Sequence, residues 1–168
     1  MNNILNAIVI NLATLGPFGK KFPAPGTVGS LIGFLIFGLL LLSAKFSISS
    51  IILASIPLIL IGIPICTRAE IILEIEDPKS VIWDEFSTIP LVFLFFDESS
   101  LENSLIQSIG WLTLGFLLFR FFDIAKPLGI RKLQILPKGL GVMVDDIAAA
   151  IASATILWLI QTFPLSFF

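Results

Sequence analysis

Long stretches without a charged side chain run through this sequence and restrict what it can fold into. Residues 22–44, 46–67 and 147–168 each contain more than 20 residues without Asp, Glu, Lys or Arg. A helix of about 20 apolar residues, rising about 1.5 Å per residue, crosses the hydrocarbon core of a bilayer. Residues 103–119 form a fourth uncharged run, and residues 86–96 form a shorter one. The sequence therefore predicts an all-α fold, a compact bundle of five to six apolar helices embedded in a membrane.

The composition agrees with this prediction. Apolar residues make up 57% of the chain and charged residues only 13%, whereas soluble domains carry about a quarter charged residues. A length of 168 residues suits one domain, so we expect residues 1–168 to form a single domain. A compact soluble bundle around a fully apolar helix is the alternative. The net charge of −2 gives no indication of nucleic-acid binding.

The chain also lacks the residues that most often bind transition metals. It has no histidine and a single cysteine, Cys66, which excludes an internal disulfide and a cysteine metal site. Any metal must therefore be bound by oxygen atoms, which favours magnesium, manganese or calcium.

If the spans alternate in direction, most of the polar residues gather on one side. The predicted crossings cover residues 28–44, 47–67, 84–96, 104–122 and 143–165. One face then carries residues 20–30, the loop at 68–85 and the stretch at 120–146. Nine of the ten basic residues lie there, and only Lys45 lies opposite, with Asp97, Glu98 and Glu102. Because positively charged loops stay inside, this face is predicted to be cytoplasmic.

The turn at 23–30 carries two prolines and two hydroxyl side chains. Pro23 and Pro25 break regular structure, and Thr27 is predicted to be the N-cap of a helix from Val28 to Leu42. The free N–H groups of such a helix start, together with the Thr27 and Ser30 hydroxyls, suit an anion such as phosphate. An ordinary capped turn is the alternative.

Five acidic residues border the apolar runs: Asp84, Glu85, Asp123, Asp145 and Asp146. Each alone could be a helix cap or an ion-pair partner. Gathered on one face, they repel one another, so we expect a cation such as Mg²⁺ among them. Arg120 and Lys126 lie one helical turn on either side of Asp123 and can bind a phosphate dianion. Gly139 and Gly141 let the backbone approach a ligand closely.

Four segments, PAPGTVGS, VIWDEF, FRFFDIAKPLGIR and GLGVMVDDIAAAI, resemble in order and spacing the phosphatidylglycerophosphatase A family. The resemblance extends from about Pro23 to Ala154. It implies Mg²⁺-dependent hydrolysis of the phosphomonoester of phosphatidylglycerophosphate, a phospholipid, to phosphatidylglycerol at the bacterial cytoplasmic membrane. The five acids fall on the family's acidic positions. Arg120, Lys126 and Arg131 fall on its basic positions, and Thr27 and Ser30 on its glycine-rich turn.

The mechanism expected from this match is metal-assisted attack on the phosphomonoester. Asp123, Asp145 and Asp146, with Asp84, are expected to hold Mg²⁺, and Glu85 is the candidate general base. An aspartyl-phosphate intermediate is the rival route. Arg120, Lys126 and Arg131 are expected to bind the phosphate.

The sequence departs from the family pattern in two places and leaves other functions open. Ser87 and Thr88 stand where many members have a small residue and glycine. The segment from Lys132 to Lys138 lacks the acidic residue and histidine that many members have there. The alternatives are a phosphatase for a soluble phosphoester and a non-enzymatic membrane scaffold or ion-binding subunit.

Overall fold

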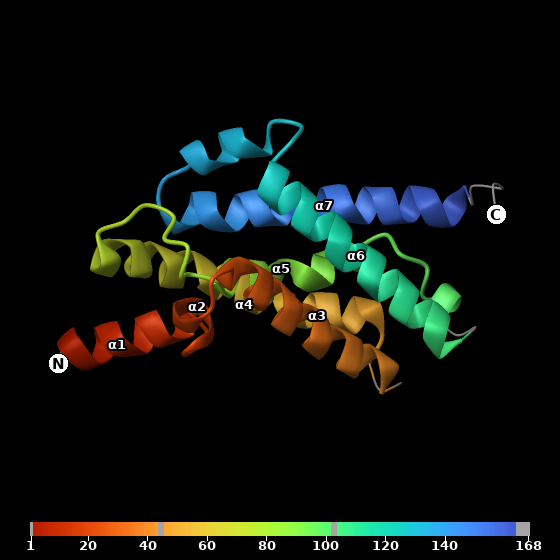
Figure 1. The fold of residues 1–168 in the computed structure, drawn as a ribbon, viewed down its shortest axis with the longest axis horizontal. Coiled ribbons are helices and arrows are strands. Elements are labelled where there is room, and N and C mark those ends of the chain that lie inside the picture. The colour runs from red at the N-terminus through yellow and green to blue at the C-terminus, as the bar shows by residue number, and fades with distance from the viewer. Residues whose placement is uncertain (1, 44–45, 102–103, 164–168) are drawn as a thin grey trace.

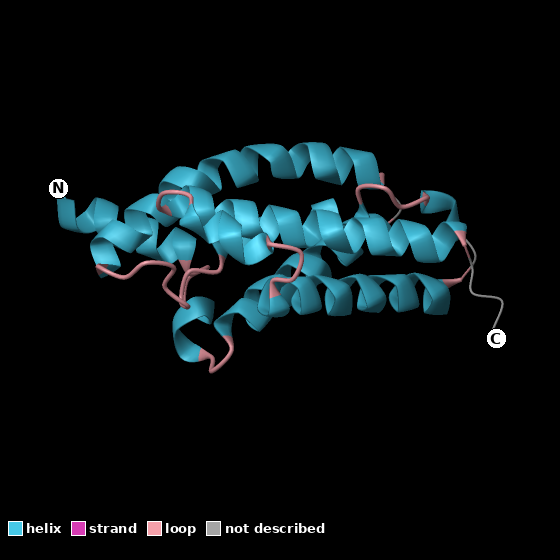
Figure 2. Cartoon of the chain, turned by 90° about the horizontal axis from the view of Figure 1, so that it is seen from above, coloured by secondary structure: helices cyan, strands magenta, loops and turns pink. Residues whose placement is uncertain are grey.

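The computed structural model describes residues 2–43, 46–101 and 104–163, and in this part of the chain every regular element is helical (Figure 2). Its α-helices are α1 (Asn2–Ala13), α2 (Phe18–Lys21), α3 (Pro25–Leu42), α4 (Ile48–Leu73), α5 (Trp83–Thr88), α6 (Leu105–Ala125) and α7 (Gly139–Thr162). Its 3₁₀ helices are η1 (Ile89–Phe93), η2 (Glu98–Leu101) and η3 (Ile130–Ile135). The predicted all-α fold is confirmed. The predicted positions of Lys45 and Glu102 lie outside the described residues.

Helix α3 begins at Pro25, so the predicted N-cap at Thr27 is wrong. Ala24 occupies the N-cap position, and Pro25 is the first helical residue. Proline suits that position because its φ is already near the helical value and its missing N–H would have no partner there. Thr27 therefore lies within the first turn of α3.

Four helices, α3, α4, α6 and α7, are long and apolar enough to cross a membrane. Large apolar side chains cover their outer surfaces; Leu39 is 70% exposed, Leu53 69% and Ile106 85%. A soluble monomer rarely exposes so much contiguous apolar surface. The membrane-embedded bundle, rather than the soluble alternative, accounts for this surface.

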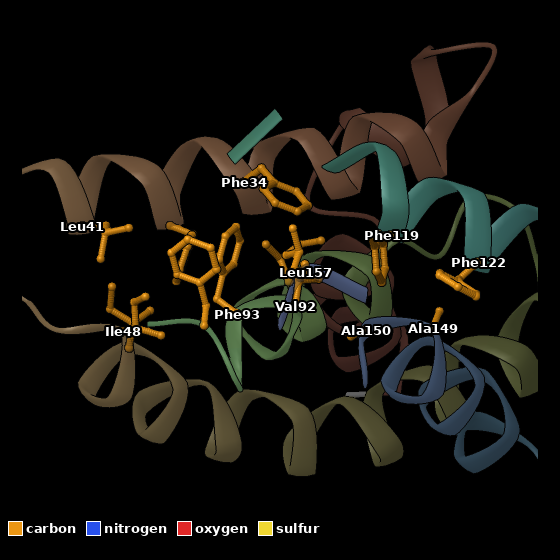
Figure 3. Packing of buried hydrophobic residues seen from close by; sticks show 14 of the residues in the cluster. Phe34, Leu41, Ile48, Val92, Phe93, Phe119, Phe122, Ala149, Ala150 and Leu157 are labelled. Atoms are coloured by element: carbon orange, nitrogen blue, oxygen red, sulfur yellow. The ribbon is translucent and has the colours of Figure 1, made fainter. Parts of the chain in front are cut away.

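The fifth predicted crossing, residues 84–96, is a broken segment inside the bundle. The short helix α5 passes into η1 at Ile89, and Pro90 lies in the first turn of η1. Val92 and Phe93 are fully buried among the long helices (Figure 3). The segment still leads from one end of the bundle to the other, because the Asp97 N–H donates to Gln161 Oε1 (2.8 Å) near the end of α7.

Aromatic side chains form the centre of the core. The ring of Phe93 stacks on Phe37 at a centroid distance of 4.8 Å and meets Phe34 edge-on at 6.1 Å (Figure 3). On α7, the small buried residues Ala149 and Ala150 let this helix lie close to α6. Each fully buried large side chain contributes about 1.5–3 kcal/mol of burial free energy, so the core fixes α3, α6 and α7 relative to one another.

Polar helix ends meet around the junction of these elements. The start of α3, the start of α5, the end of α6 and the start of α7 converge there, while the end of α3, the start of α6 and the end of α7 lie toward the other end (Figure 1). This arrangement agrees with the alternating connections predicted from the sequence.

Candidate active site

A cavity of about 430 Å³ opens where the polar helix ends meet. All five predicted acidic residues contribute to its wall, together with Arg120, Lys126 and Thr27. The other lining residues are Pro23, Ala24, Pro25, Gly26, Asp77, Lys79, Val81 and Ile124. The fold therefore brings to one cavity residues that are separated by about 120 positions in the sequence.

The acidic side chains are buried, and several of their oxygen atoms have no hydrogen-bond partner. Asp84 is 6% exposed, and Asp146 is 3% exposed. Asp84 Oδ1, Glu85 Oε2 and Asp146 Oδ2 have no partner in the structure. Leaving a buried polar atom unpaired costs about 1–3 kcal/mol, and more for a charged group. The cavity therefore offers unsatisfied negative oxygens to a positively charged ligand.

Two cations already pair with other acids of the cavity. The Arg120 guanidinium pairs with Asp123, one turn along α6, and its Nη1 lies 3.7 Å from Glu85 Oε1. The Lys126 ammonium pairs with Asp145 on α7. Both cations are largely buried, so water screens these pairs less than it screens surface pairs. Arg120 and Lys126 are thus held beside the acids, as the sequence predicted.

Ser30 holds Arg120 from the side of α3. Arg120 Nη1 donates to Ser30 Oγ at 3.1 Å, and Ser30 Oγ donates to the Gly26 carbonyl at 2.9 Å. Ser30 is completely buried and does not line the cavity. Its contact is therefore with the cation that was predicted to bind phosphate.

Electrostatics in the cavity disfavours full ionisation of the acids. Burial raises the pKa of Asp84 well above its ordinary value, and the charges of Asp77 and Asp145 raise it further. Burial likewise raises the pKa of Glu85, and Asp84 and Asp123 add to this rise against the lowering effect of Arg120. Burial lowers the pKa of Lys126, but its hydrogen bond to Asp145 and the negative charges of Asp145, Asp146 and Asp123 together outweigh this effect, and the net change is upward. Additional positive charge would relieve the repulsion among the acids.

The donor chemistry of the cavity fits a hard divalent cation such as Mg²⁺. Its acidic oxygens are the ligand type that Mg²⁺ prefers, and Asp84 and Asp146 each have a buried unpaired oxygen. Among the described residues, no group of three acidic side chains surrounds a single point. Asp123 and Asp145 are each turned toward a cation of the protein. A four-carboxylate site would therefore require these two side chains to exchange an ion-pair partner for the metal.

Besides Ser30, three more of the predicted substrate-binding residues lie outside the cavity wall. Arg131 is exposed on η3 and does not line the cavity. A Cβ on Gly139 would come within 2.3 Å of the Thr67 backbone nitrogen, and a Cβ on Gly141 within 2.6 Å of the Leu136 carbonyl oxygen. The two glycines therefore allow α7 to approach α4 and the segment after η3; their approach to a ligand stays a prediction.

The sequence analysis missed Asp77, which lines the cavity from the loop between α4 and α5. Its backbone lies in the left-handed region at φ 46°. Its N–H donates to Glu70 Oε1, and its Oδ2 accepts from Gln134 Nε2, both at 2.9 Å. The Asp77–Pro78 pair, typical of a defined turn, was the signal available in the sequence. Lys79, in the same loop, also lines the cavity and was not predicted as a site residue.

The sequence analysis also missed why Gly26 is glycine. A Cβ at this position would lie 1.9 Å from Glu85 Oε1. A side chain at position 26 would therefore require the Glu85 carboxylate to move. The close spacing of glycines in the PAPGTVGS segment could have indicated a close approach of the backbone here. The sequence does not indicate that the partner is Glu85 on α5.

Comparison with known proteins agrees with the geometry of the site. The family model for phosphatidylglycerophosphatase A matches residues 11–161. The chain is 34% identical over 160 residues to phosphatidylglycerophosphatase A of Haemophilus influenzae, covering 95% of this chain and 91% of that protein. It is 29% identical over 137 residues to phosphatidylglycerophosphatase A of Escherichia coli, covering 81% of this chain and 73% of that protein.

A third relative carries a different name. A Bacteroides thetaiotaomicron protein named provisionally as a phosphatidylinositol-3-phosphatase is 31% identical over 142 residues, covering 81% of this chain and 84% of that protein. No solved structure matches the chain. The family match extends from the end of α1 to the last turn of α7 and includes every acid of the cavity. The chain therefore belongs to the phosphatidylglycerophosphatase A family and is a phosphatase.

Proposed function

We propose that this phosphatase hydrolyses the terminal phosphomonoester of phosphatidylglycerophosphate, with Mg²⁺, to phosphatidylglycerol and inorganic phosphate. The names of its two relatives from Haemophilus influenzae and Escherichia coli support this substrate. The observation that carries the proposal is the cavity itself. Buried acids with unpaired oxygens stand beside Arg120 and Lys126 at the end of a bundle of apolar helices.

The location of the cavity suits a lipid headgroup. Its wall is made by the ends of long apolar helices, so a phosphate bound there can remain attached to a lipid whose tails lie in the bilayer. Basic residues in the segments around the cavity, such as Lys20, Arg68 and Lys132, favour a cytoplasmic position of this end. We therefore place the enzyme in the bacterial inner membrane with the cavity open to the cytoplasm.

Arg120 and Lys126 are proposed to bind the phosphate. The planar Arg120 guanidinium can donate two parallel hydrogen bonds to phosphate oxygens, and the Lys126 ammonium acts as a point charge. Each is held by an acidic partner, Asp123 or Asp145. When Asp123 and Asp145 exchange these partners for the metal, both cations become available to the phosphate.

Asp84, Asp123, Asp145 and Asp146 are proposed to hold the metal, through their carboxylate oxygens. When bound, Mg²⁺ would neutralise phosphate oxygens and acidify a water molecule. Glu85 is proposed as the general base that takes a proton from the attacking water at a carboxylate oxygen. Its Oε1 lies 3.7 Å from Arg120 Nη1, and this positive charge opposes the rise in the Glu85 pKa that burial causes.

The test measures inorganic phosphate released by the purified protein in detergent micelles. We expect release from phosphatidylglycerophosphate with Mg²⁺ and none with EDTA. Glycerol 3-phosphate tests a soluble substrate, and phosphatidylinositol 3-phosphate tests the substrate in the name of the third relative. Phosphate release that is equal with and without Mg²⁺, or faster from either competitor, would contradict the proposal.

Two matched variants test whether activity depends on the acids of the cavity rather than on acids elsewhere in the protein. Asp84→Asn removes a buried acid of the cavity, whereas Asp97→Asn removes an acid that lies near the end of α7 and outside the cavity wall. We expect Asp84→Asn to lose at least about a hundredfold in turnover and Asp97→Asn to retain it. Equal rates in the two variants would remove Asp84 from the site.

A further inference from the structure

An apolar groove of about 400 Å³ lies between α3 and α6. Buried Phe34 and half-buried Phe116, whose rings meet edge-on at 5.5 Å, form part of its floor. Leu35 and Ile109, which are 57% and 50% exposed, stand on its two sides. The groove is therefore a hollow in the membrane-facing surface rather than a gap closed by side chains.

The groove is aligned with the polar cavity on both helices. On α3, Leu31 of the groove lies one turn after Thr27 of the cavity. On α6, Phe116 of the groove lies one turn before Arg120 of the cavity. Residues four apart lie on the same face of a helix. The faces of α3 and α6 that form the end of the cavity therefore continue into the walls of the groove.

The groove follows most of the length of α3. From Leu31 to Leu42, the α3 side of the groove covers 11 residue steps, or about 16 Å at about 1.5 Å per residue. Leu42 is the last residue of α3, so the groove runs from one turn beyond the cavity to the far end of this span. A hydrocarbon chain that starts near the cavity can therefore lie in the groove along this length.

The chemistry of the groove selects a hydrocarbon ligand. Thr113 carries a polar side-chain group in the wall, and its hydroxyl already donates to the Ile109 carbonyl at 2.8 Å. The wall therefore offers dispersion contacts and no free donor. A molecule that fills both hollows needs a phosphate at one end and a hydrocarbon chain at the other. A phospholipid has that arrangement, whereas a helix of a second copy would fill only the groove.

We propose that the groove between α3 and α6 binds one acyl chain of the phospholipid whose phosphate is bound in the polar cavity. This inference rests on the proposed function, because it takes the substrate to be a lipid. It assigns to the α3–α6 surface a role in substrate binding, in addition to its contact with the membrane. The groove would hold the lipid against one side of the bundle while the headgroup reaches the acids.

Filling the groove tests the proposal. Thr113→Trp places a large ring in the groove from an exposed position, and Gly38→Leu fills it from α3, where a Cβ would lie 3.2 Å from Leu112 Cδ1. Leu60→Trp is the matched control, because Leu60 is an exposed side chain of α4 outside the groove. The kcat/KM is measured for dioleoyl and dihexanoyl phosphatidylglycerophosphate in the same detergent.

The expected result is a change in the ratio of the two kcat/KM values. We expect the dioleoyl-to-dihexanoyl ratio to fall about tenfold in Thr113→Trp and Gly38→Leu and to stay at the wild-type value in Leu60→Trp. An unchanged ratio in both groove variants would overturn the proposal. Failure of the proposed function would look different, because the wild-type protein would then release phosphate from neither lipid.

A photolabelling experiment distinguishes binding of an acyl chain in the groove from general contact of the protein surface with lipid. Phosphatidylglycerol with a photoreactive diazirine at the end of one acyl chain is irradiated with the wild-type protein in nanodiscs. We expect the label on residues 31–42 and 109–116, and competition by excess unlabelled phosphatidylglycerol. A label spread evenly over the exposed side chains of α4 and α7, or one that does not compete, would overturn the proposal.

Discussion

Replacing Asp146 by asparagine should stabilise the metal-free protein and remove most of its response to Mg²⁺. Asp146 is 3% exposed, its Oδ2 has no hydrogen-bond partner, and it shares the cavity with five other acids. Neutralising a buried unpaired carboxylate relieves about 1–3 kcal/mol of unsatisfied burial. In a chain of this length, about 1 kcal/mol shifts the melting temperature by about 2–4 °C. We therefore expect the variant to melt about 2–12 °C above wild type in EDTA.

Added Mg²⁺ should reverse this order. An ion at a hundred times its dissociation constant stabilises the native state by about 2.7 kcal/mol, which corresponds to about 5–10 °C for wild type. The variant lacks one ligand and should show little of this shift. Its turnover should fall at least about a hundredfold, because the charge that binds the metal is lost.

Thermal unfolding in detergent, followed by intrinsic fluorescence with Mg²⁺ or EDTA, measures both effects. Asp97→Asn is the control, because this exposed carboxylate lies outside the cavity. It should melt like wild type under both conditions. An Asp146→Asn protein that is less stable than wild type in EDTA, yet gains as much from Mg²⁺, would refute the reasoning.

Three further results are expected. Lys126→Met should lower kcat/KM and weaken inhibition by vanadate without weakening Mg²⁺ binding; lost activity with unaltered vanadate inhibition would contradict phosphate binding by Lys126. Gly26→Ala, whose Cβ would lie 1.9 Å from Glu85 Oε1, should cut turnover about a hundredfold with an unchanged circular dichroism spectrum, since a misplacement of about 1 Å has that effect; normal turnover would remove Glu85 from the reaction. In a cysteine-free background, a cysteine at Ser99 should react with an impermeant reagent outside intact cells and one at Lys132 should not; labelling of both would contradict the proposed orientation.

The long helices could be predicted from the sequence because an apolar run of bilayer length has few other stable arrangements. The run at 22–44 became α3, and the run at 46–67 became most of α4. The crossing at 84–96 was predicted less well. Its apolar residues suit a buried segment as well as a lipid-facing span, and Pro90 interrupts the α-helix after a turn and a half. Hydropathy alone does not distinguish these two arrangements.

The gathering of the acids could be predicted, but their individual partners could not. Alternating helices bring the ends that carry Asp84, Asp123 and Asp145 to one place whatever the side chains do. The pairing of Lys126 with Asp145 depends on the distance between α6 and α7, which follows from packing along their whole length.

The position of Asp77 is a second example that could not be predicted from the sequence. Its position depends on a hydrogen bond from Gln134, a residue 57 positions away. Gln134 lies in the segment where the sequence departs from the family pattern. A sequence comparison therefore registers Gln134 as a lost acid or histidine, whereas the structure gives it a partner at the edge of the cavity.

The charge of the cavity leads to a last prediction about the order of binding. At full ionisation, the five predicted acids carry five negative charges against the two positive charges of Arg120 and Lys126, and Asp77 and Lys79 add one of each sign. The cavity is then left with three negative charges, and a phosphomonoester brings close to two more at neutral pH. At the low effective dielectric of a buried site, this repulsion opposes binding of the headgroup.

On the proposed function, the lipid should therefore bind well only after a divalent cation has reduced this charge. A phosphonate analogue of phosphatidylglycerophosphate, which is not hydrolysed, allows binding to be measured by calorimetry without turnover. We expect its affinity to be at least about tenfold higher with saturating Mg²⁺ than with EDTA, a difference of about 1.4 kcal/mol. By linkage, the analogue should raise the affinity for Mg²⁺ by the same factor. Equal affinity in Mg²⁺ and EDTA would mean that Arg120 and Lys126 alone offset the charge of the acids, and that most of these acids are protonated in the native protein.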